Sequence, residues 1–443
     1  MSSTEEKNPA APENTHYDVV IAGGGMVGIS LACVLVAASD RAFAQEPAKQ
    51  FSVLVVDRAP LQASGPPAYH PSFDARATAL SLSSLEIYRA AGVEDAIRQH
   101  AEAIRSVHVS DKGHSGSNRM AASDEGLDIF GCVVENQWLG SSLLAAGASA
   151  TGVELCGRAA VSRVVPQRNG VTCVVEKAGG DSDDASAVTI SADLLVIADG
   201  AESSLRKSLG IEAERDDYRQ TAVIANVQTT QPHKGAAFER FTEEGAIAFL
   251  PLPDLADARH RSAVVWTLPN DRADALLACQ ADKQSERIRE TMQQEFGFRL
   301  GEINRVGEVQ AYPLSRVFAR EQVRSHVVVM GNAAHSLHPI AGQGFNLALR
   351  DSAALVECVV DARRGDTPIG SLIVLERYLE AQEQDQQLTM GVSHQLIKLF
   401  GWQALPVQAG RSLGMLTMEM LRPLKSSFAR RAAGIAVRSA DLG

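Results

Sequence analysis

Several features that would place this chain in other classes of protein are missing from it. Its six cysteines lie far apart and none forms a C-x-x-C pair, so neither a zinc site nor a dithiol redox centre is predicted. No run of about 18 apolar residues occurs, so we expect no membrane-spanning helix. The net charge of -11 and the lack of a long basic stripe argue against nucleic-acid binding. These absences predict a cytoplasmic protein without a metal site or a nucleic-acid partner.

The remaining composition fits a globular protein. With 443 residues, of which 45% are hydrophobic, the chain can bury a large core in one domain or in two closely joined domains. Residues 1–16 are polar and acidic, without the basic and then apolar order of a signal peptide, and they predict a disordered leader. Free cysteines usually pack as small hydrophobes, and we expect most of these to be buried. They are Cys33, Cys132, Cys156, Cys173, Cys279 and Cys358.

A glycine motif near the N-terminus indicates a dinucleotide site. The segment YDVVIAGGGMVGIS reads as a strand, then Gly23, Gly25 and Gly28 in G-x-G-x-x-G spacing, then a helix. In that context the glycines allow a tight turn and close approach of a pyrophosphate to the helix amides. Asp57 ends the second strand, FSVLVVD, where its carboxylate can accept ribose hydroxyls. The interval from Gly28 to Asp57 is longer than the roughly 20 residues usual for this acidic partner. The polar run SDRAFAQEPAKQ accounts for the extra residues, because it predicts a loop between the helix and the strand.

Two later segments also read as a strand, a turn and the start of a helix. DLLVIADGAESSLRKSLG ends its strand at Asp199 and Gly200 and opens a helix that carries Arg206. By itself this pattern predicts only a capped helix. VVVMGNAAHSLHPIAGQGFNLALRD contains Pro339 and Gly342, which with the neighbouring glycine let the backbone approach a flat or anionic ligand. We expect a large ligand to dock at this last segment.

Together with FDARATALS around Arg76, these segments resemble the class A flavin aromatic hydroxylases. The resemblance implies the fold of para-hydroxybenzoate hydroxylase: α/β, with a Rossmann-like FAD-binding domain, an antiparallel-sheet substrate domain and C-terminal helices. It also implies that NAD(P)H reduces FAD, which then uses dioxygen to hydroxylate an electron-rich phenol. Most of that class has aspartate where this chain has Asn332. Asparagine still hydrogen-bonds a ribityl hydroxyl, but it removes a charge.

The resemblance also implies which residues contact the cofactor. The glycine motif would hold the FAD pyrophosphate, the Asp-Gly segment would touch flavin and nicotinamide, and the Gly-Asn-Ala-Ala-His segment would close over the ribityl chain and isoalloxazine. The expected cofactor-binding residues are Gly23, Gly25, Gly28, Asp57, Arg76, Asn136, Asp199, Gly200, Arg206, Asn332, Pro339, Gly342, Gly344, Phe345 and Asn346. His335 and His338 flank the expected flavin ring and are candidates for catalysis, although a loop histidine more often caps or packs.

Longer strings resemble one group within that class, the 2-octaprenyl-6-methoxyphenol hydroxylases of ubiquinone biosynthesis. These strings are SVHVSDKGHSG, YRQTAVIANVQT, GAAFERFTEEGAIAFLPL, QEFGFRLGEI and LHPIAGQGFNLALRD. That group also has Gly-Asn in place of Gly-Asp, and the likeness runs from about Tyr17 to the C-terminus. It implies a polyprenyl phenol as substrate and allows contact with a ubiquinone-biosynthesis complex and with the inner face of the membrane.

Several other functions are alternatives to this one. Sister hydroxylases that act at another ring position share the motifs, and a flavin-binding protein without hydroxylase activity is a further alternative. A disulfide reductase or simple dehydrogenase would show a second G-x-G-x-x-G or a redox cysteine pair, and this chain has neither. A flavin halogenase would show Trp-x-Trp-x-Ile-Pro, which is also missing.

The pattern of predicted elements divides the chain into regions. We expect the FAD-binding domain in residues 17–210 and 319–385, a substrate-domain sheet in 211–318 and a helical region in 386–443. Alternating apolar and polar residues in TAVIANVQT, GAAFERF, AIAFLPL and SAVVWTLP predict an antiparallel sheet with one covered face, and SERIRETMQQEF predicts a helix after it. The short runs VHVS and GCVVE are candidates for the substrate side.

Two charged segments leave alternatives open. GGDSDDASAVTIS is favoured as a solvated hairpin tip over a calcium site, because the ordered ligand spacing is missing. Near the C-terminus, HQLIKLFGW and SLGMLTMEML predict apolar helices followed by basic residues. These residues either form a solvated face of a packed helical layer or contact anionic lipid headgroups. They are Arg422, Lys425, Arg430, Arg431 and Arg438.

Overall fold

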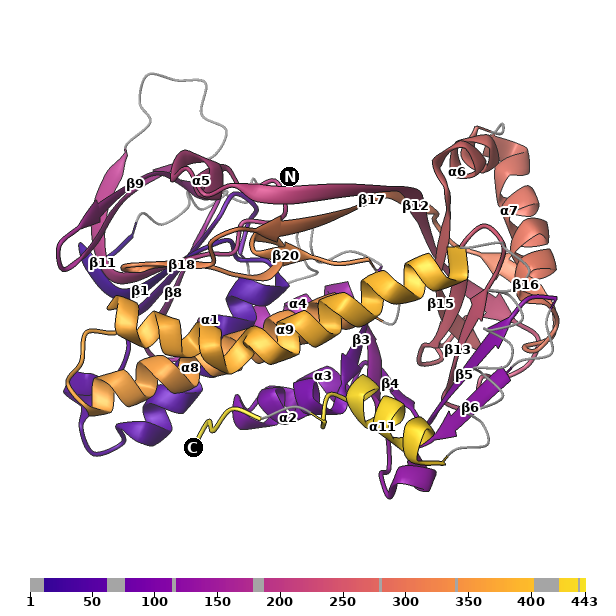
Figure 1. The fold of residues 1–443 in the computed structure, drawn as a ribbon, viewed down its shortest axis with the longest axis horizontal. Helices are drawn as coiled ribbons and strands as arrows, with labels where there is room; N and C mark the ends of the chain where they lie inside the picture. Colours follow the sequence, from indigo (N-terminus) through magenta and orange to yellow (C-terminus); the bar gives the residue numbers. More distant parts are fainter. Residues whose placement is uncertain are drawn as a thin grey trace, which may run out of the picture.

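The computed structural model describes residues 12–61, 76–113, 117–177, 187–278, 281–338, 342–401, 422–436 and 439–443. Two lobes, each built on a β-sheet, are joined by the long strands β12 (Ala213–Thr229) and β17 (Gln310–Ala319) and by α9 (Leu372–Gly401), which runs toward the second sheet (Figure 1). Some predictions concern residues outside the described part: most of the leader, the hairpin tip, Cys279, Pro339 and Arg438.

The first lobe is built on an eight-stranded sheet. Five of its strands are parallel in the order β8-β2-β1-β11-β19, while β18 and the hairpin partners β9 and β10 add antiparallel strands. This arrangement confirms the dinucleotide-binding pattern of strands and the β10–β11 hairpin. The strands are β1 (His16–Ala22), β2 (Val53–Asp57), β8 (Val153–Gly157), β9 (Ala159–Gln167), β10 (Gly170–Lys177), β11 (Val188–Ile197), β18 (Val323–Arg324) and β19 (Val327–Val329).

The central strands of this sheet bury both faces, because successive side chains point to opposite sides. In β1, Val19 and Ile21 pack into a core shared with helices, whereas Val20 and Ala22 pack into a second core with β9, β10 and α5 (Ser204–Ser208). The helices of the first core are α1 (Met26–Ala42), α2 (Leu82–Ala90), α3 (Glu94–Arg98), α4 (Asn136–Ser149), α8 (Gln343–Arg364) and α9. The carboxyl ends of the parallel strands therefore stay at one edge, where a ligand can bind.

The second lobe is a nine-stranded sheet with strands in the order β20-β17-β12-β15-β14-β13-β5-β6, and β16 also pairs with β12. The predicted antiparallel sheet is confirmed, with one difference: β5 pairs with β13 in parallel. The run VHVS thus belongs to this sheet, while GCVVE lies in a separate three-stranded sheet, β3-β7-β4. The strands are β5 (Ser106–Asp111), β6 (Ser117–Ala121), β13 (Ala236–Phe241), β14 (Ala246–Pro251), β15 (Arg261–Pro269), β16 (Ile303–Val306) and β20 (His335–Ser336), with β3 (Ala77–Ser81), β4 (Ala101–Ile104) and β7 (Gly131–Glu135).

One face of the nine-stranded sheet is covered by α6 (Asn270–Leu277) and α7 (Ala281–Phe296). Val223, Ile247 and Trp266 on this face are buried against the two helices, and the rings of Phe249 and Phe296 stack with centroids 3.8 Å apart. The intervening side chains of the same strands point to the other face. That face remains for a ligand.

The C-terminal helix α11 (Arg422–Ala432) lies beside β4, below the second sheet (Figure 1). Ala429 and Ala433 are buried in a small core between the three-stranded sheet and the nine-stranded sheet, while Arg430 and Arg431 are exposed. The apolar side of this helix is thus packed, which is compatible with both alternatives for its basic residues, and the predicted helix SLGMLTMEML lies outside the described residues. Short 3-10 helices are η1 (Pro47–Lys49), η2 (Ala122–Glu125) and η3 (Gly331–Ala333). No helix in the described part of the chain is long and apolar enough to cross a membrane.

Five cysteines lie within the described residues, and all five are buried, as expected. Burial raises the pKa of the Cys33 and Cys132 thiols to about 12, so neither ionises near neutral pH. These thiols therefore act as small hydrophobic groups in the core.

Candidate cofactor and substrate site

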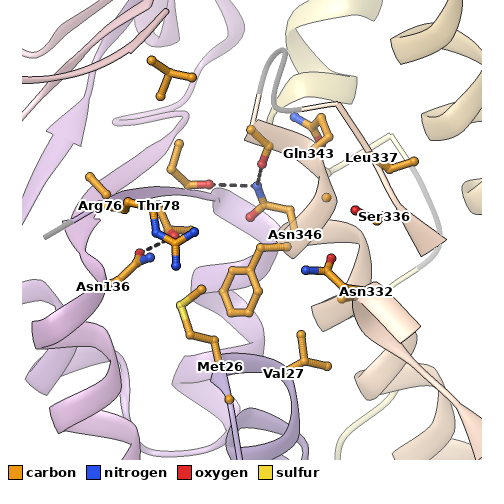
Figure 2. A pocket seen from close by; sticks show the side chains of 18 of the residues that line it. Met26, Val27, Arg76, Thr78, Asn136, Asn332, Ser336, Leu337, Gln343 and Asn346 are labelled. Atoms are coloured by element: carbon orange, nitrogen blue, oxygen red, sulfur yellow. Dashed lines mark hydrogen bonds between the residues drawn. The ribbon is translucent and has the colours of Figure 1, made fainter. Parts of the chain in front are cut away.

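A cavity of about 900 Å³ lies between the first lobe and the open face of the nine-stranded sheet. This volume is at the upper end of the roughly 300–1,000 Å³ usual for ligand pockets, so the cavity suits a large ligand or two ligands together. Figure 2 shows side chains that reach its middle from three sides. They are Met26 and Val27; Arg76, Thr78 and Asn136; and Asn332, Ser336, Leu337 and Gln343, with Asn346 between the last two groups.

The glycine motif forms the turn between β1 and α1 at one end of the cavity. Gly23 has φ +115°, and a Cβ there would lie 2.4 Å from the carbonyl oxygen of Ala198 at the end of β11. A Cβ on Gly28 would lie 1.8 Å from the carbonyl oxygen of Gly23, so α1 packs on the turn only because residue 28 is glycine. Gly25 is the N-cap of α1 and lines the cavity. The first amides of a helix have no intrahelical acceptor, so this turn fits the pyrophosphate of a dinucleotide.

Asp57 lies at the end of β2 and lines the cavity beside this turn. Its Oδ2 accepts the N–H of Gly24 at 2.6 Å, and its Oδ1 accepts the N–H of Ala59 at 2.7 Å. These two bonds fix the carboxylate. Since each carboxylate oxygen has a second lone pair, Asp57 can also accept ligand hydroxyls, as predicted for a ribose.

The Asp-Gly segment reaches the cavity only in part. Asp199 and Gly200 both line it, and Gly200 has φ +97°, a conformation that favours glycine. Burial raises the pKa of Asp199, and a hydrogen bond with Ser203 opposes that rise. Arg206 does not line the cavity: it is 3% exposed, and its guanidinium donates to the carbonyl oxygens of Ala333 at 2.5 Å and Ala201 at 3.2 Å. The structure thus places Arg206 under η3 rather than on a ligand wall.

The third segment lines the cavity from the opposite side. Asn332 of η3 and Ser336, Leu337 and His338 after it belong to the wall, while Ala333, Ala334 and His335 are buried beneath. The wall continues at the start of α8, where the cavity-lining residues are Gly342, Gln343, Gly344, Phe345 and Asn346. Gly342 is the N-cap, with φ +59°. Two glycine-containing turns and two helix N-termini therefore face the same space.

Asn346 holds the start of α8 against β3. Its amide nitrogen donates to the carbonyl oxygens of Ala79 and Gly342, both at 2.8 Å (Figure 2). Its amide oxygen accepts from the backbone N–H of Ser81 at 2.8 Å and from the hydroxyl of Ser84 at 2.7 Å. Two donors and two acceptor sites are thereby occupied, which is the full capacity of an asparagine amide. Asn346 therefore shapes the wall, and its amide has no bond to spare for a ligand.

Arg76 and Asn136 form a further part of the wall. The backbone N–H of Asn136 donates to the carbonyl oxygen of Arg76 at 2.7 Å, and the hydroxyl of Thr78 donates to the side-chain oxygen of Asn136 at 2.7 Å (Figure 2). The Arg76 guanidinium lies over the ring of Tyr312, 4.7 Å from its centroid. This cation–π contact brings a charged group of the first lobe onto a strand of the second sheet.

The two histidines have different surroundings. His338 lines the cavity, its Nε2 lies 3.1 Å from Oε1 of Gln220, and its ring meets Tyr218 edge-on at 5.0 Å. Burial lowers the pKa of His338 to about 4, so the ring is neutral at pH 7. His335 points into the core instead, where its Nε2 lies 2.6 Å from the carboxylate of Asp351. Of the two candidates, only His338 can touch a ligand in the cavity.

The substrate half of the cavity was not identified residue by residue from the sequence. Strand pairing places one row of side chains side by side across five strands: Ile224, Val265, Ala248, Glu239 and Val109. All of them line the cavity. Neighbouring strands are about 4.8 Å apart, so this row extends for roughly 20 Å. The available signal was the alternation of alanines in AIAFLP, whose Ala246 and Ala248 share this face.

A second row is apolar throughout, whereas the first row contains one charged residue, Glu239. The second row pairs Ala263 with Leu250, and Val107 with both Ala237 and Met120. Phe428 and Ala429 of α11 close this part of the cavity. The small side chains leave room along the sheet, and most of the surface offers no hydrogen bond. It suits a long apolar group rather than a polar one.

Comparison with known proteins gives a consistent result. A family model described as "FAD binding domain" matches residues 16–378. Ubiquinone hydroxylase UbiL of Rhodospirillum rubrum is 31% identical over 94% of this chain and 89% of that protein. The 3-demethoxyubiquinol 3-hydroxylase of Escherichia coli is 28% identical over 95% of this chain and 100% of that protein. The crystal structure of p-nitrophenol 4-monooxygenase PnpA from Pseudomonas putida matches with a TM-score of 0.73 at 16% identity, covering 96% of this chain and 100% of that one.

Proposed function

Because this chain belongs to the FAD binding domain family, in which its relatives include ubiquinone hydroxylases, we propose that it hydroxylates a polyprenyl-methoxyphenol in ubiquinone biosynthesis. The reaction uses FAD, NAD(P)H and dioxygen. The observation that carries this proposal is that one cavity reaches from the glycine turn before α1 to a mostly apolar sheet face long enough for an isoprenoid chain. A protein that only held FAD would need no such second half.

The residues at the first end of the cavity fit FAD. The amides at the start of α1 would bind its pyrophosphate, and Asp57 would bind its ribose. Asn332 and the start of α8 would face the ribityl chain and the flavin ring, and Asp199 with Gly200 would lie where flavin and NAD(P)H meet. Bound FAD supplies hydride acceptance from NAD(P)H and the activation of dioxygen.

The residues at the second end would orient the phenol. We place the aromatic ring at the flavin end of the sheet, near Ala222 and Tyr312, which are opposite each other on β12 and β17 and both line the cavity. The isoprenoid tail would then cross the strands along the row that contains Ala248. The apolar wall excludes water around the ring, which protects a reactive oxidising cofactor from side reactions.

The row of side chains that would hold the tail is called the tail channel below. Its far end lies next to α11. The side of this helix that carries Phe428 and Ala429 faces the cavity, while Arg430 and Arg431 are exposed. Basic residues on the outer side of a helix that lines an apolar cavity suit the surface of an anionic membrane, where a polyprenyl substrate resides. We therefore propose that the enzyme takes its substrate at the membrane surface through peripheral contact.

Purified protein can test the reaction. We expect bound FAD, bleaching of its absorbance by NAD(P)H without oxygen, and faster NAD(P)H oxidation with a hydroxylated product when a polyprenyl-methoxyphenol and air are added. Bound FAD without any of the later steps would favour a flavin-binding protein without hydroxylase activity. A product hydroxylated at another ring position would favour a sister enzyme of the same pathway.

A further inference from the structure

His335 lies in the middle of the segment that lines the cofactor end of the cavity, yet its side chain points away from the cavity. Asn332, Ser336 and His338 on the same segment face the cavity. The segment has little regular structure: one turn of η3 and the two-residue strand β20, which pairs with Val317 and Phe318. Its conformation therefore depends on side chains that reach it from other elements.

One of these contacts comes from α8 and is fully buried. His335 Nε2 lies 2.6 Å from Asp351 Oδ2, and the two side chains are 0% and 1% exposed. The other oxygen of Asp351 accepts from the amide of Gln386 on α9 at 3.0 Å. Gln386 in turn exchanges two hydrogen bonds with Gln322, at 2.8 and 3.2 Å, and the carbonyl oxygen of Gln322 accepts the N–H of Val329. The chain of bonds thus returns to β19, the strand that leads into the segment.

Asp351 also belongs to the helix whose first residues face the same cavity. Gln343 and Asn346 at the start of α8 line the cofactor end, and Asp351 lies little more than one turn beyond Asn346. The pair His335–Asp351, called the anchor pair below, therefore connects two segments of the cavity wall from behind. A hydrogen bond between a buried imidazole and a buried carboxylate is strong, and removing one partner leaves the other without compensation.

We propose that the anchor pair consists of positioning residues for FAD: it fixes residues 331–338 on α8 so that Asn332, Ser336 and His338 face the cofactor. The proposal rests on the assignment of the cavity to FAD and adds residues that touch neither cofactor nor substrate. Neither anchor residue lines the cavity. Loss of the pair should therefore speed the release of FAD without removing any direct contact with it.

The chain offers a matched control at the next residue of the same helix. Arg350 Nε lies 2.5 Å from Asp385 Oδ2, and Nη2 lies 3.2 Å from Oδ1, with both side chains at or below 10% exposure. This control pair also joins α8 to α9, but its side chains bond to each other and to the Thr389 hydroxyl, not to residues 331–338. His335→Leu and Arg350→Met each leave one buried carboxylate without its main partner. The two variants are thus alike in burial and in the loss of a donor to a buried carboxylate, and they differ in whether that donor lies on residues 331–338.

The experiment measures how fast FAD leaves the full-length holoenzyme after dilution, followed by the fluorescence of released FAD, together with the melting temperature. We expect His335→Leu to release FAD at least tenfold faster than the parent, and Arg350→Met to release it within twofold of the parent although both variants melt earlier. His335→Gln keeps an amide donor for Asp351 and should restore release to within about threefold of the parent.

Three results would overturn the proposal: unchanged release from His335→Leu, equal acceleration by Arg350→Met, or no rescue by His335→Gln. If His335→Leu does not fold, Asp351→Asn takes its place with Asp385→Asn as its control, and the same contrast in release is expected. Equal release from these two asparagine variants would also overturn the proposal. A parent protein that purifies without FAD would instead contradict the proposed function, so the two failures are distinguishable.

Discussion

Replacing Ala248 by leucine should shorten the space for the isoprenoid tail. Ala248 lies in the middle of the cavity-facing row, between Val265 on β15 and Glu239 on β13. Leucine adds three carbons there and displaces a similar volume of tail. At about 0.8 kcal/mol per buried methylene, the displaced part of the tail loses about 2.4 kcal/mol, or roughly 60-fold in kcat/KM.

The assay compares kcat/KM for a long-tailed methoxyphenol and for the same methoxyphenol without a tail. We expect the roughly 60-fold loss for the first substrate and less than a twofold change for the second, with full FAD content. Ala160→Leu is the matched control, because Ala160 lines the same cavity from β9 of the first lobe and not from the nine-stranded sheet. That variant should bind FAD less tightly, and the fraction that still carries FAD should keep the parent's preference between the two phenols. An equal loss of kcat/KM for both phenols in Ala248→Leu would contradict the assignment of this row to the isoprenoid tail.

Other parts of the site can be tested by simpler substitutions. Gly25→Val places a branched side chain at the N-cap of α1, and the variant should purify with little flavin absorbance. A full complement of bound FAD would contradict the assignment of this turn as the pyrophosphate site. Asn332→Asp should keep FAD and lower its reduction potential in a redox titration, because a negative charge disfavours the reduced, more anionic flavin; an unchanged potential would place residue 332 away from the ring. Replacing Lys425, Arg430 and Arg431 by glutamine should weaken binding to anionic vesicles by about 1 kcal/mol per charge, as added salt should in the parent; equal binding at low salt would contradict membrane contact.

The cofactor end of the cavity could largely be located from the sequence, because its signals are local. Gly23 and Gly28 occupy positions where a Cβ would collide with backbone atoms, and such positions leave a glycine pattern along a strand, turn and helix. Asp57 could be predicted for a related reason. It is the last residue of the strand that follows the glycine motif, where an acidic residue usually binds the ribose. The FAD family match is consistent with these segments.

Side-chain direction could not be predicted in the same way. Arg206 follows a strand and a turn as a ligand-binding residue would, but its guanidinium turns under η3 to reach a carbonyl oxygen of Ala333, far away in the sequence. His335 and His338 looked equivalent in the sequence, although one is bonded to Asp351 in the core and the other lines the cavity. These differences depend on tertiary contacts that no local pattern contains.

The substrate wall depends on long-range pairing for the same reason. The parallel pairing of β5 with β13 brings Val107 and Val109 next to residues more than a hundred positions away. The strands of the sheet were predicted from their alternation, but their order across the sheet was not. Without that order, the row through Ala248 could not be recognised as one continuous surface.

The proposed hydroxylation of a polyprenyl-methoxyphenol on the way to ubiquinone can be tested in cells. The most direct measurement is the profile of quinone precursors, by mass spectrometry, in cells that lack the protein and in the same cells after it is restored. We expect a polyprenyl-methoxyphenol to accumulate without the protein and ubiquinone to return with it. An unchanged profile, or accumulation of a precursor blocked at a different ring hydroxylation, would contradict the claim.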